Sequence, residues 1–198
     1  MTTRGHIGAV IGSAILALSV TALAQPVPPL GEWAEAGDWC VGGVAVTVPE
    51  GVEAISYGAG VELRTVDGIE LGELIGPATN GVPTLEGFAD RLSTGLDCGG
   101  EDSPQVSGPS PLADAAVVAQ AVTIACRGAA GTHGAAIAAA PIPLEGEEKT
   151  ATLFMPFGDA AFTLGRHSIT AGAALSEDRL MPVFTAIAQS LRPCRETP

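Results

Sequence analysis

The first 24 residues have the organisation of a secretory signal peptide, and this limits what is left to fold. One positive charge at Arg4 precedes an uncharged apolar run over residues 7–24, which ends in Ala22-Leu23-Ala24 before Gln25. A charged n-region, an apolar h-region and an Ala-x-Ala site together predict export and cleavage after Ala24. We therefore expect about 174 residues to fold outside the cytoplasm, in a periplasmic or secreted protein whose thiols can oxidise.

The alternative interpretation of residues 7–24 is a retained membrane anchor. The run has 18 residues, which is close to the lower limit for a helix that spans a bilayer. No cluster of Lys or Arg follows it as a stop signal, and no cysteine stands just after it to carry a lipid. We therefore expect no stable membrane insertion once the segment is cleaved.

The chain is strongly acidic, with 9 Lys and Arg residues against 22 Asp and Glu residues and a formal net charge of −13. Such a surface repels nucleic acid and anionic lipid headgroups, because proteins bind both through cations that neutralise phosphate. The sequence therefore predicts no nucleic-acid partner. The acidic surface either keeps an exported protein soluble or attracts cations or a basic partner.

Four cysteines are candidates for covalent links: Cys40, Cys98, Cys126 and Cys194. None of them forms the close pair that is typical of zinc or thiol-redox sites. An even number in an exported chain predicts two disulfides, for which three pairings are possible. We favour Cys98–Cys126 with Cys40–Cys194, because this pairing nests a local loop inside a link between the ends of the chain. The chain-entropy model gives about 3–4 kcal/mol for the local bridge and at most about 5 kcal/mol for the other.

Alternating apolar and β-branched residues predict short strands between turns. The candidate strands cover residues 41–48, 52–57, 61–66, 69–75, 115–126, 135–142, 150–157 and 160–164. Asp67-Gly68 is typical of a hairpin turn, whereas residues 76–83 and the Pro-rich residues 99–111 are predicted to be loops. Because aromatic residues make up only 4% of the chain, the core must consist mainly of Val, Leu, Ile and Ala.

Two segments have the pattern of amphipathic helices. Thr84 is a good N-cap, and one apolar stripe follows it at Leu85, Phe88, Leu92 and Leu96. A second helix with its own apolar stripe is predicted to begin between positions 176 and 182 and to end at position 191. The elements together predict an α+β fold, in which an antiparallel β-sheet is covered by two amphipathic helices. We expect a signal peptide over 1–24, an extended lead-in over 25–38 and a single α+β domain over 39–198.

Three short motifs resemble the PsbP-like family, which includes photosystem extrinsic subunits and exported bacterial relatives. The motifs are VTVPEGV at 46–52, TLEGF at 84–88 and FTAIAQSL at 184–191, and they are similar to the family's opening strand and turn, its first helix and its closing helix. The chain departs from the family at Val52, where the family often has Trp, and in its four cysteines. The resemblance implies an α+β fold and brings no catalytic residue to this chain.

Two histidines remain after the predicted cleavage, His133 in a Gly-Thr-His-Gly sequence and His167 in Arg-His-Ser. Each is either an exposed turn residue or a base or metal ligand that works with a nearby carboxylate. No nucleophile-elbow or phosphate-cradle pattern occurs. The carboxylates of Asp97, Glu101 and Asp102 lie close together in the sequence, but their spacing does not match an EF-hand. We therefore assign no catalytic, cofactor-binding or metal-ligating residue and predict no cofactor.

Trp33 and Trp39 flank a short acidic stretch just before Cys40. They either pack against the core or a sheet edge, or form an exposed aromatic pair for a ligand or partner. Taken together, the sequence favours an exported, non-enzymatic binding or accessory domain with an unidentified protein or small-molecule partner. The alternative is a small secreted hydrolase that uses His133 or His167 with an acidic partner. A third hypothesis, a cation-responsive protein, predicts that calcium raises the melting temperature.

Overall fold

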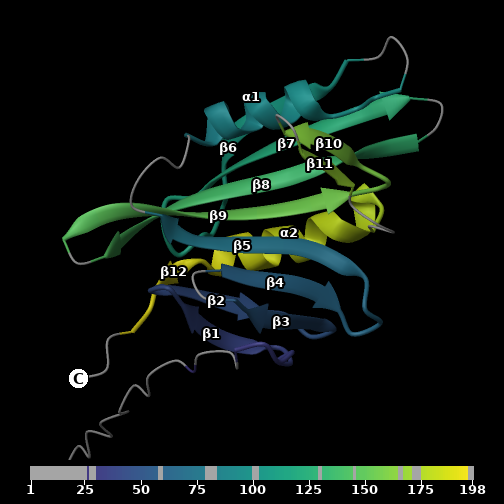
Figure 1. The fold of residues 1–198 in the computed structure, drawn as a ribbon. Coiled ribbons are helices and arrows are strands. Elements are labelled where there is room, and N and C mark those ends of the chain that lie inside the picture. The colour runs from purple at the N-terminus through teal and green to yellow at the C-terminus, as the bar shows by residue number, and fades with distance from the viewer. Residues whose placement is uncertain are drawn as a thin grey trace, which may run out of the picture.

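The computed structural model describes residue 26 and residues 30–57, 60–78, 84–99, 103–128, 131–144, 146–164, 167–170 and 175–195. The predicted signal peptide lies outside this part of the chain. Within it, a seven-stranded antiparallel sheet forms the middle layer of the molecule (Figure 1). In spatial order its strands are β3 (Val52–Ser56), β4 (Gly60–Thr65), β5 (Glu70–Ala78), β9 (Glu147–Phe157), β8 (Gly131–Leu144), β7 (Gln120–Gly128) and β6 (Gln105–Pro111).

One face of this sheet carries helix α1 (Leu85–Gly95) and a hairpin formed by β10 (Ala161–Leu164) and β11 (His167–Thr170). The hydroxyl of Thr84 caps α1 by accepting a hydrogen bond from the Gly87 N–H at 3.2 Å. The helix buries its apolar stripe against β7, β8 and β10. This cluster contains Leu85, Ala89, Leu92, Leu96, Val122, Ile124, Ala135, Ile137 and Phe162.

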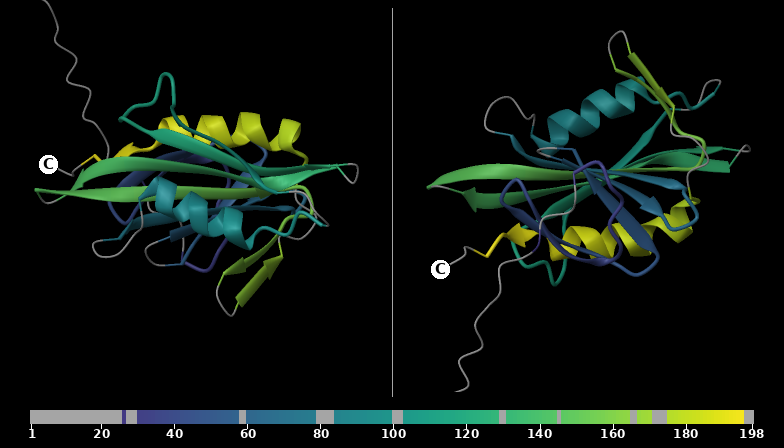
Figure 2. Two further views of the ribbon diagram at one scale, coloured as in Figure 1. Left: turned by 90° about the horizontal axis from the view of Figure 1, so that it is seen from above. Right: turned by 60° about the horizontal axis from the view of Figure 1, so that its bottom comes forward.

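The opposite face carries helix α2 (Glu177–Ser190) and a second, three-stranded sheet. The second sheet has the order β1 (Gly37–Val41), β2 (Val44–Val48) and β12 (Arg192–Pro193). Helix α2 packs on β2, β8 and β9, so that the larger of the two cores lies between the sheets. The two helices lie on opposite sides of the middle sheet (Figure 2).

The four cysteines form two disulfides, in the pairing favoured from the sequence. Cys40 in β1 is bonded to Cys194, which follows β12; we call this the terminal disulfide. Cys98, just after α1, is bonded to Cys126 in β7; we call this the local disulfide. The terminal disulfide joins residues 154 positions apart and so holds the two ends of the described chain together.

The prediction of an α+β fold with one sheet covered by two helices is wrong. Strands make up 54% of the described residues, and α2 shares its face of the middle sheet with a second sheet. The segment 99–111, predicted to be a loop, contains β6, because an edge strand tolerates proline where its missing N–H would face solvent. The strand predicted over 41–48 corresponds to β2 together with the last residue of β1, and β1 and β2 form a hairpin over 37–48. It turns at Gly42 and Gly43, which both have positive φ.

Candidate functional site

Helix α1 covers only part of the face of the middle sheet on which it packs. The helix packs on β6, β7 and β8, and the remaining part of this side is formed by β3, β4, β5 and the neighbouring edge of β9. Two large side chains on this part are exposed to solvent: the exposed fraction is 36% for Ile75 and 50% for Tyr57. We call this surface the open face and define it as Glu53, Ile55, Tyr57, Glu62, Arg64, Glu73, Ile75 and Phe154.

The strand register places four of these residues in one row across the sheet. Ile55 pairs with Glu62, Glu62 pairs with Glu73, and Glu73 pairs with Phe154. Directly opposite residues share a face and have Cβ atoms about 4.5–5.5 Å apart, so that Glu62 and Glu73 are nearest neighbours. Both side chains are half-buried. Like charges in this position destabilise a sheet.

Tyr57 reaches over this row from the end of β3. Its hydroxyl donates a hydrogen bond to Oε2 of Glu73 at 2.8 Å. Burial, the hydrogen bond to Glu73 and the charges of Glu73 and Glu62 raise the pKa of Tyr57 well above its ordinary value. The phenol therefore stays protonated and keeps its ring beside the two carboxylates.

Arg64 supplies the only positive charge of the open face, and other groups already engage it. Its Nε donates to Oε2 of Glu53 at 2.8 Å, and its guanidinium lies 3.7 Å from the centre of the Trp33 ring. The ion pairs in the described part of the chain involve Arg64, Arg127 and Arg192, and none of them reaches Glu62 or Glu73. The two facing carboxylates are thus left without a cation of their own among these residues.

Aromatic side chains form the border between the open face and α1. Phe154 lies edge-on to Phe88 of α1, with ring centres 6.3 Å apart, and edge-on to Phe162 at 5.9 Å. Phe88 and Phe154 are both partly exposed. The open face therefore combines two unpaired carboxylates with apolar and aromatic surface, next to the stacked pair of Trp33 and Arg64.

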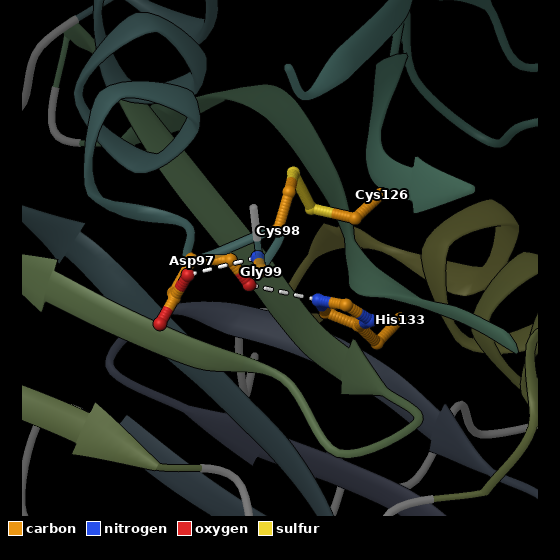
Figure 3. Close-up of a disulfide and its surroundings, with 5 residues drawn as sticks. All are labelled: Asp97, Cys98, Gly99, Cys126 and His133. Atoms are coloured by element: carbon orange, nitrogen blue, oxygen red, sulfur yellow. Dashed lines mark hydrogen bonds between the residues drawn. A yellow bond between two sulfur atoms is a disulfide. The ribbon is translucent and has the colours of Figure 1, made fainter. Parts of the chain in front are cut away.

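Among the described residues, His133 has no carboxylate partner of the kind that the hydrolase hypothesis requires. His133 lies opposite Cys126 in the sheet, and its Nε2 is 2.9 Å from the backbone oxygen of Asp97 (Figure 3). Because a carbonyl oxygen only accepts, Nε2 must carry the hydrogen. The carboxylate of Asp97 points away from the ring and accepts from the Gly99 N–H at 2.9 Å. Among the described residues, this histidine ties β8 to the end of α1 beside the local disulfide.

The other candidates from the sequence are described only in part. His167 belongs to β11, and its side chain lies outside the description. Asp97 is described, but Glu101 and Asp102 are not. Trp33 contacts Arg64 on the open face, whereas Trp39 packs against the core on the other side of the sheet and donates to the Glu35 carbonyl at 3.2 Å. The hypothesis of an exposed pair of tryptophans therefore fails.

Sequence reasoning missed Glu62, Glu73 and Ile75, although a signal for them was present. A two-residue turn at Asp67-Gly68 pairs residues that are equally distant from the turn, and this rule places Glu62 opposite Glu73. The structure has a β-bulge between Leu63 and Arg64, but beyond it the register returns to this pairing. The predicted hairpin therefore implies that the two carboxylates face each other.

Two shallow hollows lie elsewhere on the surface. One, of about 410 Å³, is at the start of α1 and is lined by Thr84, Leu85, Glu86, Val118, Gln120, Ala139, Pro141 and Thr150. The other, of about 440 Å³, is lined by residues 111–112 and 114–119. They share Val118, which is 79% exposed. Neither contains a histidine or a pair of opposed charges.

No three His, Cys, Asp or Glu side chains in the described ranges are arranged to hold a metal ion. Neither described helix is both long and apolar enough to cross a membrane. Comparisons of the chain with protein-family models, curated proteins and solved structures found no match. The resemblance to the PsbP-like family therefore stays a prediction, and the open face is the candidate functional site of the described residues.

Proposed function

We propose that this protein is an exported, non-enzymatic binding module that holds a partner polypeptide on its open face. The observation that carries the proposal is the facing pair Glu62 and Glu73, which has no cation of its own among the described residues and lies beside the exposed Tyr57 and Ile75. A sheet face that only meets solvent gains stability when charges of opposite sign stand opposite each other. The arrangement here lowers stability instead, and a partner would offset that cost.

The composition of the open face also supports binding. Interfaces are enriched in aromatic side chains, which bring large contact areas together with a polar group. Tyr57, Phe88, Phe154 and Trp33 lie on or beside the open face in a chain with only eight aromatic residues. The two disulfides fit a protein of an oxidising compartment, which supports the proposal that the chain is exported.

The proposal is tested by site-specific photo-crosslinking in the cells that make the protein. A photoreactive benzoylphenylalanine replaces Ile75 in one variant and Val118 in the control. Val118 is exposed on the same side of the sheet but lies away from the open face. We expect discrete covalent adducts from position 75 upon irradiation and none from position 118. The absence of an adduct at position 75, or the same adducts at both positions, would overturn the proposal.

A further inference from the structure

The chemistry of the open face also limits what its partner can be, and this inference rests on the proposed function. We infer that the partner is an extended, basic segment of another polypeptide, which places an Arg or Lys side chain between Glu62 and Glu73 and an apolar side chain on Ile75. Three features support this partner: the two facing carboxylates, the apolar side chain beside them, and the poor fit of other occupants.

The first feature is the pair of facing carboxylates. A guanidinium or ammonium group has several N–H donors and can bind two carboxylates at once. Such a cation also favours an aromatic ring beside it, and the hydrogen bond from Tyr57 to Glu73 holds a ring at this place. The chain itself uses the same combination next door, where Arg64 pairs with Glu53 and stacks on Trp33. A basic side chain from outside would complete a second copy of this arrangement.

The second feature depends on the spacing along β5. Glu73 and Ile75 are two residues apart on the same face, which corresponds to about 7 Å along a strand. An extended partner presents its own side chains to one side with the same spacing of two residues. A segment in which basic and apolar residues occupy alternate outward positions therefore matches both Glu73 and Ile75.

The third feature is the poor fit of other occupants. A calcium or magnesium ion needs several converging oxygen ligands, and the described residues hold no such group. A second copy of the chain would bring the same two carboxylates and a formal net charge of −13 against the open face. Anionic lipid is repelled for the same reason. A basic polypeptide is the occupant whose charge is complementary to the face.

The experiment titrates the full mature chain, with both disulfides intact, with the blocked peptide SRSISRSIS. The comparison peptide is SESISESIS, which has the same length and apolar residues but opposite charge. Isothermal titration calorimetry at low and high salt reports the affinity. We expect binding of the basic peptide only, with an affinity that falls as salt rises, because charge attraction is screened.

Two double variants then locate the binding site. Glu62→Gln with Glu73→Gln removes the facing carboxylates and keeps an acceptor for the Tyr57 hydroxyl. Glu147→Gln with Glu148→Gln is the matched control, because it removes two exposed charges at the far end of β9, about 20 Å along the strand from Phe154. We expect the first variant to weaken binding by about tenfold or more and the control by less than about twofold. The melting temperature of both variants verifies that they fold.

Each alternative result has a defined meaning. Equal binding of both peptides, equal losses in both double variants, or no binding of the basic peptide would overturn the inference about the partner's chemistry. Any of these results combined with adducts from position 75 in cells would leave the proposed binding function standing. Dimerisation that is lost in Glu62→Gln with Glu73→Gln would identify a second copy as the occupant and would also overturn the inference.

Discussion

Replacing Glu62 with glutamine removes one of the two facing carboxylates and leaves the shape of the side chain almost unchanged. Glu73 keeps its hydrogen bond from Tyr57, so the only large change is the loss of one negative charge opposite another. Because the ion pairs of the described residues leave Glu62 and Glu73 without a cation, Glu62→Gln should increase the free energy of unfolding. This is an unusual direction, because most substitutions destabilise a protein.

The size of the gain follows from the position of the pair. Two unit charges about 5 Å apart repel each other by about 0.8 kcal/mol in a water-like medium. Cross-strand charge pairs contribute about 0.2–1 kcal/mol. Because both side chains are half-buried, we expect the upper part of this range, about 0.5–1 kcal/mol. For a chain of this size the gain corresponds to a rise of about 1–4 °C in melting temperature.

The assay is thermal and denaturant unfolding of Glu62→Gln at low salt and at 1 M salt. Glu148→Gln serves as the control, since its side chain is exposed and its cross-strand partner is Pro143. The difference in the free energy of unfolding between the two variants separates the repulsion within the Glu62–Glu73 pair from the effect of a lower net negative charge. It should shrink at 1 M salt, where charges are screened over about 3 Å.

A second readout comes from Tyr57, which is the only tyrosine of the chain. Burial and Glu73 raise the pKa of Tyr57 more than the charge of Glu62 does, so Glu62→Gln should lower that pKa only slightly. The tyrosinate absorbance measures it directly. Equal or lower stability of Glu62→Gln relative to Glu148→Gln would contradict the expected repulsion between Glu62 and Glu73.

Three further predictions concern the frame that holds the open face. Replacing both cysteines of the terminal disulfide with serine should lower the free energy of unfolding by up to about 5 kcal/mol. The same change in the local disulfide should lower it by less, about 3–4 kcal/mol. Denaturant midpoints under non-reducing conditions measure both losses, and the opposite order would contradict this prediction. Phe184→Ala should cost about 3–5 kcal/mol, because Phe184 is fully buried between α2 and the sheets, and a loss below about 1 kcal/mol would contradict the described packing. The hydrogen bond from Thr47, followed by the Arg192 guanidinium, holds the pKa of Asp38 below its ordinary value, so its stabilisation is present above about pH 4 and is lost as pH falls through the lowered pKa. Asp38→Asn should therefore cost about 0.5–1 kcal/mol at pH 7 and progressively less as the pH falls below about 4, and a cost that stays constant with pH in unfolding experiments would contradict the assignment.

The sequence predicted those parts of the fold that depend on local signals. The N-cap at Thr84 and the apolar stripe after it correctly placed α1, and a second stripe placed α2. The disulfide pairing also followed from the order of the cysteines along the chain. These features depend on neighbouring residues or on simple loop closure, and both can be read from one sequence.

The arrangement of the strands could not be predicted in the same way. The Pro-rich stretch that contains β6 has few strand signals, and it becomes a strand because it pairs with the edge of β7. The strand predicted over 41–48 contains β2 but only Val41 of β1, so the sequence missed β1 and placed the turn at Gly42 and Gly43 inside a strand. The second sheet depends on the pairing of β2 with β12, which lie at opposite ends of the chain. Such long-range pairings leave little trace in local patterns. The pairing of β5 with β9, which joins β3, β4 and β5 of the open face to the rest of the middle sheet, is of the same kind.

Amide chemical-shift mapping of the mature chain during titration with SRSISRSIS locates the bound peptide residue by residue. The account predicts that the largest shifts fall on β4 and β5, around Glu62, Glu73 and Ile75, and that they vanish in Glu62→Gln with Glu73→Gln. Shifts that cluster instead around Val118 and the hollows beside α1, or that are spread evenly over the acidic surface, would contradict it.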